Sequence, residues 1–392
     1  MNDYEKLELY RNYTCNELIK LKDDPIAMYC LGECCTNNDK KLKWYILSAE
    51  QGFDLAQLDL GIIYEENEEY EKAVYWFTKA AEQGDDSAQW CLGECYYVGR
   101  GVEKDLEKAA YWYEKAANQG HDFAQLELGY MYKKGEGVKR NYKKAFKLFK
   151  EAAENGVRGG QDSAKCELGR FYEAGIVVKQ DFKKALQIYK ELIDISFPPA
   201  IDRMGFCYRH GHGVEKNYKK AAYWYKKAAE RGYIDSMFTL GFFYYHGMGV
   251  KQNYKKAAYW YRKASLFDDA SAINNLALCY LYGKGVKQNY KKAVKLYEKG
   301  ISLGDSFSMN GLGKCYEKGL GVKQDEEQAI ELYELSASKD NTWALTNLGK
   351  YYYDKKDYLK SKEYFLRLKK RSYCDKEVEE YLEKINDKLK EN

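Results

Sequence analysis

Histidine, proline and long apolar runs are scarce in this chain of 392 residues. It has four histidines and three prolines, and so few prolines favour helices, because proline breaks a helix interior. No stretch approaches the ~18 consecutive apolar residues of a membrane-spanning helix. Residues 1–20 also lack the basic start and apolar core of a signal peptide. These absences predict a soluble, cytoplasmic protein.

The chain repeats itself at a fixed spacing. Residues 217–225 return almost letter for letter at 253–261, and in a looser form at 289–297. A period of 36 residues is typical of stacked helical repeats, in which each unit buries its apolar face against its neighbours. We expect ten repeats, because a Leu-Gly pair or a close variant occurs ten times. The second residues of these pairs, here called the marker positions, are Gly32, Gly61, Gly93, Gly129, Gly169, Gly205, Gly241, Ala277, Gly313 and Gly349.

The first half of each repeat has the pattern of a helix that another helix crosses closely. A leucine before the marker and a tyrosine three residues after it, such as Leu240 and Tyr244, are four residues apart and fall on one helical face. Glycine in a helix interior costs about 1 kcal/mol relative to alanine. Its repetition at the marker therefore indicates a packing requirement, namely a neighbouring helix at close range.

A turn and a second helix complete each repeat. Six repeats have a Gly-x-Gly-Val turn, as at residues 247–250, where glycine permits positive φ. In repeat 5 Val177 replaces the second glycine. An Asn or Asp such as Asn253 then supplies an N-cap. The second helix carries an aromatic residue at one position in every repeat: Tyr45, Phe77, Tyr113, Phe149, Tyr189, Tyr225, Tyr261, Tyr297, Tyr333 and Phe365.

At these residues the chain resembles the Sel-1-like repeat family, a relative of the tetratricopeptide repeat with a longer turn between its helices. The resemblance covers about residues 24–370. It implies an all-α fold, a right-handed superhelical α-solenoid of about ten helix-turn-helix repeats. We expect residues 1–23 to form an N-terminal capping helix. Residues 371–392 should form a C-terminal capping helix, because they place apolar residues at helical spacing between charges.

Five of the eleven cysteines share one position, two residues after the marker: Cys34, Cys95, Cys207, Cys279 and Cys315. Other repeats carry Ile, Met or Phe there, so we expect these cysteines to be buried apolar residues. Some secreted members of the family pair a cysteine in each helix of a repeat. The second partner is missing here and the number of cysteines is odd, so we expect reduced thiols.

Catalytic and metal-binding patterns are weak. Cys207, His210, His212 and His246 lie in neighbouring repeats and could be considered as metal ligands. However, Cys207 belongs to the buried column, and the histidines fall at helix ends and in a turn. The Gly-x-Gly turns follow helices rather than strands and lack the Lys-Ser/Thr ending of a phosphate loop. We predict no catalytic residue, no metal and no cofactor.

Positive charge is concentrated in repeats 6 to 8. The whole chain has a net charge of +4, but residues 214–300 hold 17 Lys and Arg against 6 Asp and Glu. Pairs at 219–220, 255–256 and 291–292 stack in register on the outer helices. An RNA or an anionic membrane could bind this stripe through phosphate contacts. The alternative, which we favour, is a solvated outer face made basic by repetition of one unit.

The candidate partner site is the concave groove that first helices line in tetratricopeptide-like solenoids. Residues six and three before the marker and one and four after it share one helical face there. These positions vary between repeats whereas the packing positions do not. We predict that the groove residues bind the partner: Trp90, Tyr97, Tyr130, Arg170, Phe206, Arg209, Phe238, Phe242, Tyr245, Leu278 and Leu281.

The resemblance and this apolar groove together predict a non-enzymatic scaffold or adaptor that binds a protein or peptide. One alternative is the RNA or membrane binder described above. Another is a β-lactamase-like or cell-wall-ligand hydrolase, as among cysteine-rich bacterial relatives, which would require secretion and paired cysteines. The sequence leaves the partner's identity and the oligomeric state open.

Overall fold

The structure is a computed structural model that describes residues 2–156, 159–370 and 376–391. Within these residues there are 23 α-helices and no β-strand, so the prediction of an all-α fold is confirmed. The chain divides into two compact units, residues 1–195 and 196–392. Each unit holds five of the predicted repeats.

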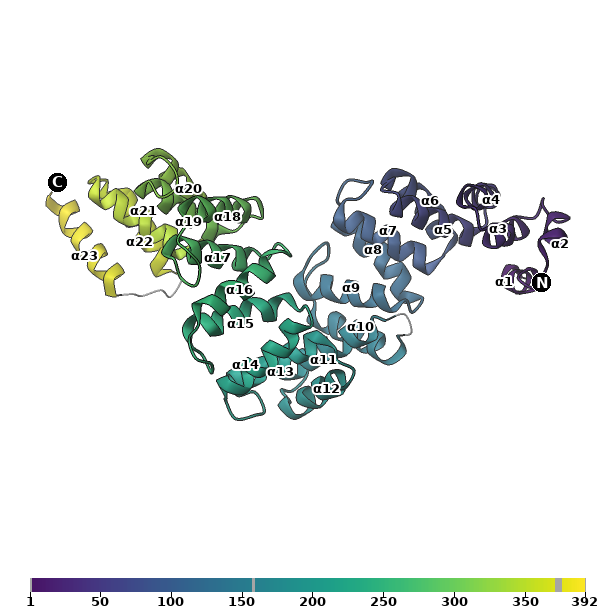
Figure 1. Cartoon of the computed structure of the whole chain (residues 1–392), viewed down its shortest axis with the longest axis horizontal. Helices are drawn as coiled ribbons and strands as arrows, with labels where there is room; N and C mark the ends of the chain where they lie inside the picture. Colours follow the sequence, from purple (N-terminus) through teal and green to yellow (C-terminus); the bar gives the residue numbers. More distant parts are fainter. Residues whose placement is uncertain (1, 157–158, 371–375, 392) are drawn as a thin grey trace. The chain divides into compact units, whose positions relative to one another are not determined.

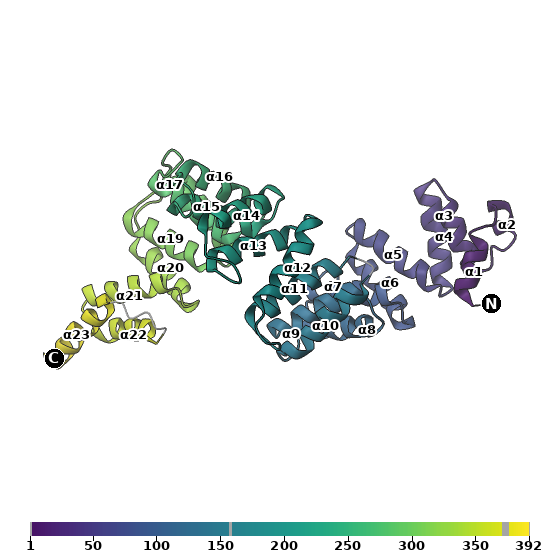
Figure 2. The same cartoon turned by 90° about the horizontal axis from the view of Figure 1, so that it is seen from below.

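In the first unit, two short helices precede five helix pairs (Figure 1). The second helix of each pair packs on the first helix of its own pair, and α4, α6, α8 and α10 also pack on the first helix of the next pair, which gives the layered order seen from a second direction in Figure 2. The helices are α1 (Asp3–Tyr10), α2 (Cys15–Ile19), α3 (Pro25–Cys34), α4 (Asn38–Glu50), α5 (Asp54–Glu66), α6 (Tyr70–Gln83), α7 (Asp86–Val98), α8 (Leu106–Asn118), α9 (Asp122–Lys134), α10 (Tyr142–Asn155), α11 (Gln161–Ala174) and α12 (Phe182–Asp194).

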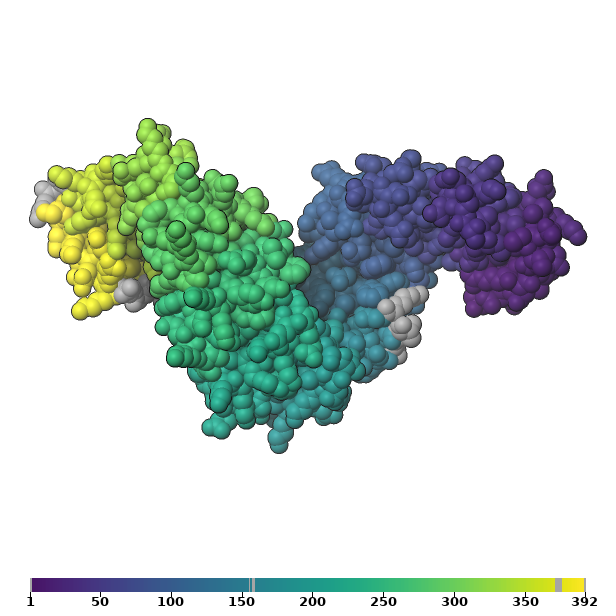
Figure 3. Space-filling model, in the orientation of Figure 1, coloured from purple at the N-terminus to yellow at the C-terminus, as the bar shows by residue number. Residues whose placement is uncertain are grey.

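The second unit has five helix pairs followed by one more helix. Successive repeats within it form a continuous packed surface (Figure 3), and α17 contacts α19 as α19 contacts α21. The helices are α13 (Pro198–His210), α14 (Tyr218–Glu230), α15 (Ile234–His246), α16 (Tyr254–Ser265), α17 (Ala270–Tyr282), α18 (Tyr290–Ser302), α19 (Ser306–Lys318), α20 (Glu326–Ser338), α21 (Thr342–Asp354), α22 (Tyr358–Lys369) and α23 (Lys376–Glu391).

An aromatic ring from the second helix lies directly on the marker glycine in nine of the ten repeats. A Cβ placed on Gly241 would lie 2.7 Å from the Tyr261 ring, which is 1 % exposed. The ring fills the space of a side chain, so only glycine fits the close-packed interior. The predicted close crossing is confirmed. The other pairs are Gly32–Tyr45, Gly61–Phe77, Gly93–Tyr113, Gly129–Phe149, Gly169–Tyr189, Gly205–Tyr225, Gly313–Tyr333 and Gly349–Phe365.

Repeat 8 solves the same packing problem differently. Its marker is Ala277, whose methyl group takes space that the ring of Tyr297 would otherwise use. The ring edge lies against Gly311 of the next repeat, where an added Cβ would be 2.6 Å from Cζ of Tyr297. The other repeats carry a larger residue two before the marker, where Gly311 stands. We infer that Gly311 compensates for Ala277.

The turn glycines have two separate roles. The first glycine of the turn ends the helix in the left-handed conformation, as Gly247 does with φ +73°. The second, Gly249, has φ +65° and also approaches the backbone of the preceding repeat, because an added Cβ would lie 2.2 Å from the carbonyl carbon of Tyr218. Val177 adopts φ +70° at the equivalent position, an unfavourable conformation for a β-branched residue.

The chain ends differ from the other repeats. Residues 1–23 hold two short helices, α1 and α2, where a single capping helix was expected. In the C-terminal segment α23 packs on α22, and the side chain of Ile385 is fully buried. Residues 371–375 of the expected C-terminal helix lie outside the described residues.

The cysteine prediction holds for four of its five residues. Cys95, Cys207, Cys279 and Cys315 are buried, and the ten cysteines within the described residues are free thiols. Cys34 is exposed, so its predicted burial is wrong. The reason is local: α3 ends at Cys34, two residues after its marker, whereas α7 continues to Val98, five residues after Gly93.

Candidate functional site

The predicted groove positions form a face on the first helices, here called the first-helix face. Trp90, Tyr97, Tyr130 and Arg170 lie on it in the first unit, and the other seven candidates lie in the second unit. Ten of the eleven are half-buried. Leu281 is only 3 % exposed, so the expectation that it is exposed is wrong. It packs into the core of repeat 8 with Ala277 and Tyr297.

In the first unit contacts within the protein engage these side chains. The Trp90 ring stacks on His121 of the next repeat, with ring centres 5.5 Å apart, and the Tyr97 hydroxyl donates to Glu136 at 3.2 Å. Arg170 donates to the buried carboxylate of Glu167 at 2.8 Å. Because contacts within the protein occupy these groups, the first unit offers less of a partner surface than its sequence indicates.

Tyr130 follows the same trend. Its ring meets that of Phe149 edge to face, with centres 5.3 Å apart. Burial is the main cause that raises the pKa of its hydroxyl. The ring therefore extends the core of repeat 4 towards the first-helix face.

In the second unit the candidates other than Arg209 are aromatic or aliphatic residues, and several have aromatic neighbours. Phe206 lies 4.3 Å from the guanidinium of Arg203, and Arg209 lies 5.8 Å from the Phe243 ring. Phe238 packs on Tyr261, with ring centres 6.0 Å apart. These side chains form an apolar surface over repeats 6 and 7.

Repeat 7 continues this surface. The Phe242 ring lies 4.2 Å from His246, and Tyr245 meets Tyr254 at 5.1 Å. The ammonium of Lys284, from the next repeat, lies 5.2 Å from the Tyr245 ring. The structure therefore brings Phe242 and Tyr245 together with a positive charge beside them.

The hydroxyl groups of the core tyrosines reach this first-helix face. In repeats 3, 5 and 9 they donate to a carboxylate one or four residues after the marker: Tyr113 to Glu94, Tyr189 to Glu173 and Tyr333 to Glu317. Sequence analysis missed this arrangement. The signal in the sequence was a glutamate that recurs one or four residues after the marker, as Glu94, Glu173 and Glu317 do.

Repeats 7 and 8 break this pattern. The hydroxyls of Tyr261 and Tyr297 are buried and have no hydrogen-bond partner. The positions that elsewhere carry the carboxylate hold Phe242 and Tyr245 in repeat 7, and leucines in repeat 8. Burial raises the pKa of both hydroxyls, so they remain protonated donors. Leaving such a group unsatisfied costs about 1–3 kcal/mol.

An apolar pocket of about 280 Å³ opens on the first-helix face of repeats 8 to 10. Gly311 of α19 is one of its lining residues. Phe307 and Trp343, which are 51 % and 63 % exposed, stand on its walls. The candidate list omitted both, although each lies six residues before its marker, on the same helical face. Its other lining residues are Asn274, Leu278, Leu281, Tyr282, Tyr297, Asn310 and Lys314.

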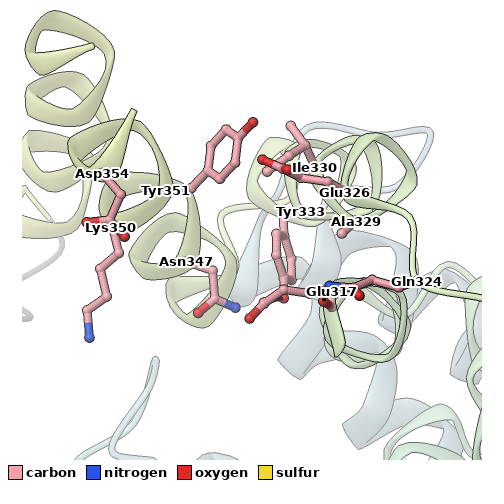
Figure 4. A pocket seen from close by; sticks show the side chains of 10 residues that line it. All are labelled: Glu317, Gln324, Glu326, Ala329, Ile330, Tyr333, Asn347, Lys350, Tyr351 and Asp354. Atoms are coloured by element: carbon pink, nitrogen blue, oxygen red, sulfur yellow. Dashed lines mark hydrogen bonds between the residues drawn. The ribbon is translucent and has the colours of Figure 1, made fainter. Parts of the chain in front are cut away.

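A second pocket, of about 340 Å³, lies between α20 and α21 and is polar (Figure 4). Its polar groups already have partners. Tyr333 donates to Glu317 at 2.6 Å, and Gln324 donates to the carbonyl oxygen of Glu317 at 2.9 Å. Lys350, which points away from the other lining residues in Figure 4, pairs with Glu377 at 2.6 Å. Internal contacts thus satisfy these polar groups, unlike the Tyr297 hydroxyl in the apolar pocket.

Glu127 makes the stability of the first unit depend on pH. Burial, together with the nearby Glu94, raises its pKa to about 7. Because the folded-state pKa lies above the ordinary value of about 4.3, stability is lost as the pH rises from about 4.5 to 7. We expect Glu127→Gln to raise the unfolding free energy at pH 8 by about 2 kcal/mol, which is less than full linkage because the side chain keeps some solvent contact.

Urea unfolding at pH 8 and pH 4.5 tests this expectation. The gain should disappear at pH 4.5, where the folded protein already holds the carboxyl group neutral. Glu82→Gln, an exposed glutamate on α6, serves as the control and should change neither value. An equal gain at both pH values would show that the effect is not ionisation of Glu127.

The considered metal cluster does not form a ligand set. Within the described ranges, no group of three His, Cys, Asp or Glu side chains is placed to hold a metal ion. Cys207 is buried in the core, and the His210 and His212 rings pack around Phe206. In the same part of the chain, every helix is too short or too polar to cross a bilayer.

The comparison with family models decides the family. The Sel1 repeat model matches ten segments, at residues 28–53, 55–85, 86–121, 122–157, 162–194, 198–233, 234–266, 270–305, 306–341 and 344–372. The chain belongs to the Sel1-repeat family. The predicted ten repeats are confirmed, and each helix pair described above is one Sel1 repeat. Sel1-repeat solenoids typically mediate protein interactions and are generally non-catalytic.

Several solved Sel1-repeat structures are similar. A Sel1 repeat protein from Oxalobacter formigenes is 28 % identical, with 82 % of this chain and 92 % of that chain covered and a TM-score of 0.51. A protective antigen present in uropathogenic Escherichia coli strains is 27 % identical over 95 % of this chain and 94 % of its own, with a TM-score of 0.49. Cysteine rich protein B from Helicobacter pylori is 29 % identical over 32 % of this chain and 96 % of its own, with a TM-score of 0.27. None of the curated proteins compared with the chain matches it.

Proposed function

We propose that this Sel1-repeat chain is a non-enzymatic adaptor that binds a protein or peptide partner in the groove formed by the first helices of repeats 6 to 8. One observation carries the proposal. In repeats 6 to 8 the position after the marker holds Phe206, Phe242 and Leu278, whereas repeats 3, 5 and 9 hold charged residues there. Half-buried aromatic clusters of this kind are enriched at protein interfaces.

The charges around this surface suit a protein ligand. Arg209 lies on the same face, and Lys284 flanks Tyr245. Both could hold a carboxylate of the partner through charge-assisted hydrogen bonds. The free thiols within the described residues are consistent with a reducing compartment, so the proposal includes a cytoplasmic location.

Affinity capture with the intact chain tests the proposal. The change is Phe242→Glu, which copies the glutamate that repeat 3 has at this position and so is compatible with the fold. We expect the amount of each specifically captured protein to fall at least tenfold, because a charge replaces an apolar contact. Ile62→Glu places the same residue at the same position of repeat 2 and should leave capture unchanged. If Phe242→Glu captures the same proteins as the native chain, the groove assignment is wrong.

The outer face is a weaker candidate. Tyr223 and Tyr259 are about half exposed beside the basic stripe, which favours stacking of single-stranded RNA bases. The same exposed tyrosine next to a lysine recurs in repeats 2 and 3, outside the region of excess positive charge. In addition, the second lysine of each pair lies over a tyrosine ring of its own repeat. Steeply salt-dependent binding of polyuridylate, insensitive to Phe242→Glu, would favour this alternative over the groove.

The hydrolase alternative has no support from the cysteines. The cysteine-rich relatives that motivated it would pair a cysteine in each helix of a repeat. The ten cysteines within the described ranges form no disulfide with one another, and four of the five column cysteines pack in the apolar core. We do not propose a hydrolase.

A further inference from the structure

The apolar pocket of repeats 8 to 10 carries one donor without a partner. The Tyr297 side chain is fully buried, lines the pocket, and its hydroxyl makes no hydrogen bond. In repeats 3, 5 and 9 the equivalent hydroxyl donates to a carboxylate on the first-helix face. Here Leu278 and Leu281, both pocket walls, occupy those positions, so the hydroxyl faces an apolar surface.

Two other polar groups of the pocket are placed to donate. Lys314 is the one charged residue among the ten that line it. The side-chain oxygen of Asn310 accepts from Asn347 at 2.9 Å, which leaves the Asn310 amide NH₂ group to donate. A ligand that brings acceptors suits Lys314 and Asn310, and Lys314 favours a negatively charged one.

The walls define the rest of the ligand. Phe307, Trp343 and Leu278 surround a volume of about 280 Å³, which is the size of one large side chain rather than of a folded element. Trp343 and Phe307 are exposed at its mouth, and aromatic side chains in such positions commonly anchor a partner.

We propose that this pocket binds a large apolar side chain of the partner protein, next to an acidic residue whose carboxylate reaches Lys314 and Asn310. This inference rests on the proposed function, because it names the chemistry that the partner presents to one part of the groove. In repeat 9 the pocket beside the core tyrosine is lined by charged residues, and Glu317 there already accepts from the Tyr333 hydroxyl.

Selection from a library of random dodecapeptides on the intact chain tests the pocket. We expect the enriched peptides to share a large apolar residue adjacent to Asp or Glu. The test variant is Leu278→Glu. Repeat 3 has a glutamate, Glu94, at the same position, so the fold accommodates this side chain. The new carboxylate would accept from the Tyr297 hydroxyl and place a negative charge in the pocket. Circular dichroism verifies its fold. Binding of the enriched peptides should weaken at least tenfold, whereas Ile62→Glu should leave it unchanged.

Trp343 provides an independent signal. Bound peptide should change the tryptophan emission of the chain, and this change should be absent in Trp343→Phe. The pocket assignment is wrong if the enriched peptides bind the Leu278→Glu variant as tightly as they bind the native chain. If those peptides are instead lost with Phe242→Glu, the proposed function survives while the pocket assignment fails. If no peptide is enriched, both proposals fail.

Discussion

Replacing Gly249 by alanine should lower the unfolding free energy by about 3 kcal/mol. Two effects add. The residue has φ +65°, a conformation that costs about 1–3 kcal/mol for a residue with a side chain. The new Cβ would also lie 2.2 Å from the carbonyl carbon and oxygen of Tyr218. Those are backbone atoms at the start of α14, so the contact can be relieved only if repeats 6 and 7 separate.

Gly232→Ala separates the two effects. Gly232 also has positive φ, +88°, but no atom lies within 4 Å of an added Cβ. We expect this control to lose only about 1 kcal/mol, the conformational cost alone. Urea unfolding followed by circular dichroism measures both variants. Equal losses would show that the close approach at Tyr218 contributes nothing and that φ explains the whole effect.

Gly311→Ala should destabilise the second unit by about 2 kcal/mol, although alanine is the better helix former. The new methyl group would lie 2.6 Å from Cζ of Tyr297, a ring with no exposed surface. Overpacking of this kind costs about 1–3 kcal/mol, sometimes more, and the gain in helix propensity of about 1 kcal/mol only partly offsets it.

The double variant Ala277→Gly, Gly311→Ala tests the compensation between the two positions. Glycine at the marker lets the Tyr297 ring return to the position that the equivalent ring holds in the other nine repeats. We expect the double variant to be more stable than Gly311→Ala alone, so that the two changes are strongly non-additive. Additive changes would mean that Ala277 and Gly311 do not share the Tyr297 ring.

The repeat makes the backbone of this protein readable from its sequence. Each packing position occurs ten times, so chance variation averages out and the required residue stands out at each one. Glycine at the marker and the aromatic residue of the second helix were both identified in this way, and the Gly241–Tyr261 contact explains why they occur together. The number of repeats and the helical pairs followed from the same columns.

Individual groove residues could not be read in this way, because they vary from repeat to repeat. Their environment depends on residues that are adjacent in space and distant in sequence. Trp90 was predicted to bind a partner, and only the structure shows that its ring stacks on His121, the N-cap residue of α9. Leu281 was expected to be exposed and is buried. Cys34 shows the same limit, since the early end of α3 leaves it in solvent.

The amino-acid sequence by itself therefore determined the repeating helix pair, the contact between its marker glycine and the aromatic residue of its second helix, and the family. Local periodicity and short-range packing specify all three. Only the tertiary structure decided where the packing of the repeats leaves a pocket or a hydrogen-bond donor without an acceptor. The open space beside Gly311 and the unsatisfied Tyr297 hydroxyl arise where α17, α19 and α21 come together. No single repeat contains that juxtaposition, so no pattern within one repeat could reveal it.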